Sequence, residues 1–168
     1  MRLDEVIGNH PIEADTQYFD AGGVVIGVEH RRLDAATVLA VMDKAKISDE
    51  ERQKQLDSMP NVKAGGAEEF LSVHVFGPDR NEYLRFDNID DGRAPHYHYN
   101  SPRQGYHTYE PYDLEANGNF LDWVFDCLEH RLDPMLRKAH ADDVADGLDR
   151  TALEAAIAEA RAAVAVNA

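Results

Sequence analysis

Residues 70–89, FLSVHVFGPDRNEYLRFDNI, predict a β-hairpin that forms the centre of the fold. Apolar and polar residues alternate in FLSVHVF and again in YLRFDNI, as expected for strands with one buried face. The segment between them, GPDRNE, carries the proline and aspartate that tight turns favour. PHYHYN (95–100) and GYHTYEPY (105–112) continue the alternation. We therefore expect an antiparallel meander.

The two faces of this meander can be separated, because successive side chains of a strand point to opposite sides. One face is apolar and requires helices against it; it contains Leu71, Val73, Val75, Leu84, Phe86, Tyr97 and Tyr99. The opposite face is polar and contains His74, Arg85, Asp87, His96, His98 and Asn100, with either His107 or Glu110 added by the last strand.

Residues 119–132, NFLDWVFDCLEHRL, predict the helix that covers the apolar face. Its apolar residues recur at helical spacing and Asn119 is a suitable N-cap. Asp133 and Pro134 resemble a fresh cap and first-turn proline, so we expect a break or kink there before the helix resumes.

The C-terminal part reads as an acidic linker (141–149) followed by an amphipathic helix, with Thr151 and Glu154 matching a capping box. Leu153, Ile157, Ala160 and Val164 form a narrow stripe that packs on its own domain or meets a partner helix. Burial within the same domain is the commoner fate. We accordingly divide the chain into an α+β domain (1–140) and a linker with C-terminal helix (141–168).

The first third of the chain is less regular. Residues 16–30 read as strand material interrupted by a turn at the glycine pair 22–23. Residues 34–47 fit either a helix capped by Asp34 or a strand, and both remain open. A capping box at Ser48 and Glu51 opens a short polar helix, and residues 61–69 read as a loop. The predicted class is α+β: a mostly antiparallel sheet of four to five strands, helices packed on one face, and a C-terminal helix.

Composition limits the partners. The formal net charge of −15 over 168 residues opposes nucleic-acid binding, which depends on Lys and Arg displacing phosphate counterions. No apolar run reaches the length of a membrane span, and no signal segment opens the chain, so a soluble, cytoplasmic protein is expected. Cys127, the single cysteine, lies on the apolar side of its helix and reads as a buried small hydrophobe.

The polar face carries residue types that hold metals or move protons. His96 and His98 alternate on one strand, so their Cα atoms lie about 7 Å apart with both imidazoles on one side. A divalent transition metal could bind them, with His74, His107, Asp87 or Glu110 as the third ligand. Arg85, Asp87 and Glu110 are the candidate catalytic residues, with Asp87 or Glu110 as a general base where it is not a ligand. The alternative is an ordinary solvent-facing sheet surface, which carries polar residues without any function.

The stretch YLRFDNIDDGRAPHYHYN resembles an uncharacterised group of small bacterial domains and, more distantly, is similar to TumE-type components of toxin–antitoxin pairs. The likeness covers Leu84–Asn100, with the helix from Phe120 as a further point; the longer N-terminal region and the added C-terminal helix depart from it. The resemblance implies a protein partner and a toxic activity, with Arg85, Asp87, His96 and His98 as the matching positions.

Three functions follow from these patterns. The first is a protein-interaction or self-associating module that uses the C-terminal helix, with a homo-oligomer or another protein as partner. The second is a small metal-dependent enzyme, hydrolytic or oxidative, with an HxH pair on a strand. The third is a toxin–antitoxin component in which Arg85 stabilises a phosphate while a histidine moves the proton.

Overall fold

The structure is a computed structural model that describes residues 11–44, 46–89 and 95–166. The sequence predicts that no signal segment opens the chain. That prediction concerns the first residues, of which 1–10 lie outside the described ranges. The predicted α+β class is confirmed, and the antiparallel sheet has seven strands in the order β1-β2-β3-β4-β5-β6, with β7 also paired to β5. The strands are β1 (Thr16–Asp20), β2 (Val25–Asp34), β3 (Ala67–Phe76), β4 (Glu82–Ile89), β5 (His96–Ser101), β6 (Tyr106–His107) and β7 (Glu110–Pro111).

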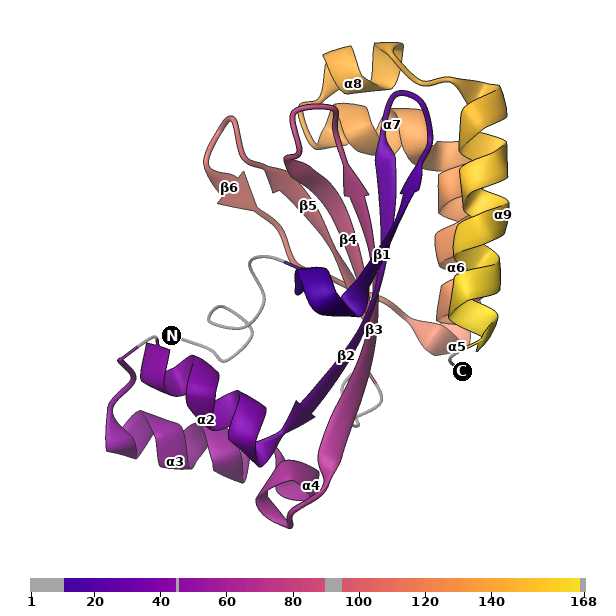
Figure 1. Cartoon of the computed structure of the whole chain (residues 1–168). Helices are drawn as coiled ribbons and strands as arrows, with labels where there is room; N and C mark the ends of the chain where they lie inside the picture. Colours follow the sequence, from indigo (N-terminus) through magenta and orange to yellow (C-terminus); the bar gives the residue numbers. More distant parts are fainter. Residues whose placement is uncertain (1–10, 45, 90–94, 167–168) are drawn as a thin grey trace.

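The helices form two groups (Figure 1). One group covers one face of the sheet and contains α5 (Leu114–Asn117), α6 (Phe120–Asp126), the π-helical turn η2 (Cys127–Arg131), α7 (Leu132–Lys138), α8 (Asp142–Asp146) and α9 (Arg150–Val166). The other lies at the far end of β2 and β3 and contains α2 (Ala35–Lys44), α3 (Asp49–Asp57) and α4 (Pro60–Lys63). The 3₁₀ turn η1 (Glu13–Asp15) precedes β1.

The main core lies between the sheet and the C-terminal helices, as the alternation predicted. Val73, Val75, Leu84 and Phe86 are buried there together with α6, α7 and α9, and Leu128 is fully enclosed. Burying a large aliphatic or aromatic side chain contributes about 1.5–3 kcal/mol each. Helices therefore cover this face of the sheet, and the polar side chains of the strands lie on the opposite face.

The helix that follows Asn119 was predicted to break at Asp133 and Pro134, and its irregular turn lies just before them, at Cys127–Arg131. Asn119 caps α6, its Oδ1 accepting from the amide of Asp122 at 3.0 Å. The chain then widens into the π-helical turn η2 and continues as α7 through Pro134. Proline has no N–H for the carbonyl four residues earlier and its ring crowds that carbonyl, so a wider turn before it relieves the conflict.

Within residues 34–47 the structure has a helix, α2 from Ala35 to Lys44, and Asp34 is the last residue of strand β2. Asp34 Oδ1 accepts hydrogen bonds from the amide and hydroxyl of Thr37, both at 2.9 Å, which fixes the first turn. Ser48 caps α3 as predicted. The predicted loop 61–69 is confirmed only for residues 64–66, because α4 continues to Lys63 and β3 begins at Ala67.

The C-terminal segment shares the core of the sheet. The predicted acidic linker contains α8, and α9 packs on β1 and β2 with its apolar stripe buried. The capping box at Thr151 is wrong: α9 begins at Arg150, and Asp149 Oδ1 accepts from the amide of Ala152 at 3.0 Å.

Candidate metal centre

The strand register places the polar side chains in two neighbouring rows that cross the sheet. In an antiparallel pair, directly opposed residues point to the same face. The first row is Glu29, Ser72, Asp87 and His96, and the second is Gly27, His74, Arg85 and His98. Both rows lie on the face opposite the main core, so the predicted polar face is present.

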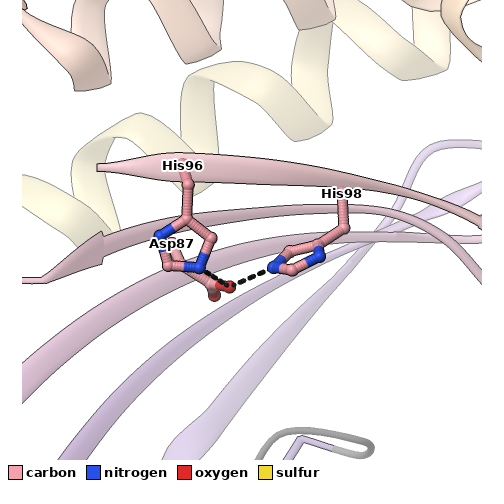
Figure 2. A group of neighbouring side chains, drawn as sticks. All are labelled: Asp87, His96 and His98. Carbon is pink, nitrogen blue, oxygen red and sulfur yellow. Dashed lines mark ion pairs between the residues drawn. The ribbon is translucent and has the colours of Figure 1, made fainter. Parts of the chain in front are cut away.

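Asp87, His96 and His98 come together at the β4–β5 end of these rows. Figure 2 shows both imidazoles projecting from β5 toward the carboxylate from β4. Asp87 Oδ2 lies 3.4 Å from Nε2 of His96 and 3.2 Å from Nε2 of His98. The three residues are only 8%, 7% and 6% exposed, and one ligand atom from each lies within 4.8 Å of the others.

These distances match the spacing of donor atoms around a small metal ion. With bonds of about 2.0–2.1 Å, two ligand atoms of a tetrahedral zinc site lie about 3.3 Å apart. The two Asp87–histidine distances are 3.4 and 3.2 Å. Two imidazoles and one carboxylate also suit iron, nickel and copper. Two of the three separations in the described cluster therefore suit a divalent ion, and the ligand atoms of the two histidines lie within 4.8 Å of each other.

The hydrogen bonds of His98 fix which ring nitrogen carries a proton. Nδ1 lies 2.7 Å from the carbonyl oxygen of Thr108, an acceptor, so Nδ1–H must donate to it. In the neutral ring, Nε2 is then a lone pair that faces the Asp87 carboxylate. Nε2 is buried and has no hydrogen-bond partner. Two acceptors at 3.2 Å repel each other unless a proton or a metal ion lies between them.

Asp87 is held in place by two further contacts. Ser72 Oγ donates to Oδ1 at 2.6 Å, and Arg85 Nε donates to Oδ2 at 3.0 Å. Burial alone would raise the pKa of Asp87, but the imidazoles of His96 and His98, the Arg85 charge and the Ser72 hydroxyl outweigh it and hold the pKa well below its usual range. Asp87 is therefore a carboxylate, the form that binds metals.

His74, predicted as a ligand, belongs to a neighbouring cluster instead. Its Nδ1 lies 2.5 Å from Oε1 of Glu82 and its Nε2 lies 3.2 Å from Oε2 of Glu29. Both nitrogens face carboxylates, so both must donate and the ring is an imidazolium. Burial works against this charge, but the two carboxylates prevail and raise the pKa of His74 to about 9. Neither ring nitrogen is free for a metal.

The last strand adds His107, not Glu110, to the polar face. His107 opposes Asn100, and its ring centre lies 6.3 Å from that of His98, outside the trio of ligands. Glu110 opposes Tyr97 and so lies on the other face, which excludes it as a ligand or base here. Tyr109 lies between His107 and Glu110 in the sequence and was not among the predicted site residues. Its ring stacks on His96 with ring centres 4.4 Å apart, and the residue is 51% exposed.

A family model described as a domain of unknown function, DUF7700, matches residues 18–164, which include the three candidate ligands. No curated protein and no solved structure matches the chain. None of the described helices has the length and apolar character required to cross a membrane.

Proposed function

The chain belongs to the DUF7700 family, and from the geometry of its site we propose that it binds a divalent first-row transition metal through Asp87, His96 and His98. The observation that carries this proposal is Nε2 of His98. It is buried, without a hydrogen-bond partner and aimed at a carboxylate, and when the ring is neutral Nε2 is an acceptor, because Nδ1–H donates to the Thr108 carbonyl. A metal ion satisfies both acceptors at once.

The surroundings of the ligands support the same reading. Metal-binding histidines commonly donate their second ring N–H to a carbonyl or carboxylate, which fixes ring orientation and tautomer. Thr108 has this role toward His98, and Ser72 and Arg85 orient Asp87. Such contacts to the ligands are a recurrent part of metal sites, and the polar residues of an ordinary solvent-facing sheet do not need them.

The number of ligands favours a reactive site over a structural one. Structural zinc sites are closed by four protein ligands, whereas catalytic sites use three and leave a position for water or substrate. Within the described residues, the cluster supplies three. We therefore favour a small metal-dependent enzyme, hydrolytic or oxidative, in which Asp87 is a ligand rather than the general base. The exposed imidazole of His107, whose ring centre lies 6.3 Å from that of His98, is the candidate for proton transfer.

The test is metal binding by the full chain, purified without a histidine tag. Zn²⁺ and Co²⁺ are titrated into protein that was first treated with a chelator, and binding is followed by calorimetry and elemental analysis. We expect one ion per chain, with affinity lowered at least about 100-fold by His98→Ala, since losing a ligand costs more than losing an outer contact. His107→Ala is the matched control and should bind normally. Equal binding by the wild type and His98→Ala refutes the site.

The other two functions remain predictions. Self-association or a protein partner at residues 141–168 would have to use the outer surface of α9, because its apolar stripe is buried in the main core. Light scattering of the full chain and of variants with charge reversals on the exposed surface of α9 would test it, because removing residues 141–168 would take buried side chains out of the main core. A toxin-like activity would appear as growth arrest on expression that His96→Ala relieves, and harmless expression of the wild type would count against it.

A further inference from the structure

The segment after β5 returns along it as β6 and β7 in a single register. His107 opposes Asn100 and Glu110 opposes Tyr97, so the same register places Thr108 opposite Tyr99. Thr108 itself belongs to neither strand, although the pairing is regular on both sides of it. The ladder is therefore interrupted next to the candidate metal centre without any change of register.

The interruption replaces one backbone hydrogen bond of the ladder. In an antiparallel sheet, the two residues of a hydrogen-bonded pair exchange both of their N–H···O bonds. The Thr108 N–H donates to the Tyr99 carbonyl at 2.9 Å, so these residues form such a pair. The Tyr99 N–H, however, donates to the side-chain oxygen of Thr108, Oγ1, at 3.2 Å. Thr108 thus accepts from Tyr99 with its hydroxyl in place of its carbonyl.

The carbonyl that is released in this way holds His98. Its oxygen lies 2.7 Å from Nδ1 of His98 and accepts the N–H of the ring. Tyr99 is buried, and a buried backbone N–H nearly always has an acceptor. Because the Thr108 hydroxyl is that acceptor, the Tyr99 N–H does not draw the carbonyl back toward the ladder and away from His98.

We infer that the hydroxyl of Thr108 is a positioning group of the metal centre, because it leaves the Thr108 carbonyl to orient His98. This inference rests on the proposed metal site. Thr108 acts through His98, whose ring N–H it accepts and whose Nε2 lies 3.2 Å from Asp87. In Thr108→Val the hydroxyl is lost, and the Tyr99 N–H and the ring N–H of His98 compete for one carbonyl. Thr108→Ser keeps the hydroxyl.

The experiment compares Co²⁺ binding by the full chain as wild type, Thr108→Val and Thr108→Ser. Each protein is treated with a chelator and then titrated by calorimetry. We expect Thr108→Val to bind Co²⁺ at least about tenfold more weakly, as is common when a contact that orients a metal-binding histidine is lost. Thr108→Ser should bind as tightly as the wild type. Thr151→Val, on α9 across the sheet, is the control for a threonine hydroxyl lost elsewhere and should bind normally.

The outcomes separate this inference from the proposed function. Failure of the wild type to bind Co²⁺ refutes the proposed function. Binding that is equally tight in the wild type and in Thr108→Val overturns this inference alone. Equal weakening in Thr108→Val and Thr108→Ser also overturns it, because the hydroxyl would then not be the group that matters.

A measurement on the wild type covers the case in which Thr108→Val does not fold. NMR couplings across hydrogen bonds connect an amide nitrogen to the carbonyl carbon that accepts its proton, and they can be recorded without metal. The Thr108 nitrogen should couple to the Tyr99 carbonyl carbon, whereas the Tyr99 nitrogen should show no coupling to the Thr108 carbonyl carbon. Coupling in both directions would mean a regular ladder and would overturn the inference.

Discussion

The imidazolium of His74 should make the stability of the fold depend on pH. The folded pKa rises from 6.5 to about 9, so the folded state retains a proton that the unfolded chain has lost. Its contribution is fully present below pH 6.5 and disappears as pH rises through 9. The change in pKa corresponds to roughly 3 kcal/mol in the free energy of unfolding. Because small domains are stable by only about 5–15 kcal/mol, such a loss is easily measured.

The assay is urea unfolding at intervals from pH 6 to pH 9, with chelator present, for the wild type, His74→Gln and the exposed-site control His107→Gln. The wild type and control should lose roughly 3 kcal/mol across the window, and His74→Gln should lack this slope. The window ends at pH 9, because burial raises the pKa of the Cys127 thiol to about 11 and adds a loss of the same sign at higher pH.

Removing His74 leaves two buried carboxylates facing each other, and the variant could fail to fold. A second measurement on the wild type covers that case: nitrogen NMR at pH 8 should show both ring nitrogens of His74 protonated. A neutral His74 ring at pH 8, or the same pH slope in a folded His74→Gln variant, would refute the reasoning.

Three further predictions concern the helical side of the molecule. Asp149→Ala removes the cap of α9 and should cost about 1 kcal/mol in urea unfolding, whereas Thr151→Ala should cost much less. Gly23→Ala would place its Cβ 2.1 Å from the carbonyl oxygen of Gly147, so the thermal midpoint should fall by many degrees; an unchanged midpoint would show that this approach is looser than described. Cys127, 1% exposed, should react with thiol reagents only after unfolding, and rapid labelling of the native protein would contradict its burial.

Side-chain parity predicted both faces of the sheet, because side chains alternate within each of the segments 70–76, 83–89 and 95–100. It also grouped Asp87, His96 and His98 before their distances were known. Parity could not choose between His107 and Glu110, since that choice depends on the register of β5 with the last strand segments.

The sequence could not predict the contacts of His98 and of the neighbouring His74, for two physical reasons. The partner of His98 is the backbone carbonyl of Thr108, and every residue type offers a carbonyl. Glu29 and Glu82 reach His74 from strands on either side of it, so their role depends on strand order. Ser72 shares the parity of His74 and could have been added to the polar face, but a single serine on a strand carries no signal of its own.

The long hairpin of β2 and β3 extends beyond the main core, where it carries α2, α3 and α4 around a second small core of Leu33, Val38, Met42, Met59 and Val62. Because this lobe has a core of its own, it meets the usual structural condition for a unit that unfolds locally. Insertions or deletions within it would change the outline of the molecule without disturbing the register of β4 and β5. The lobe is therefore the part of the fold most free to diversify, and Asp87, His96 and His98 lie outside it on β4 and β5.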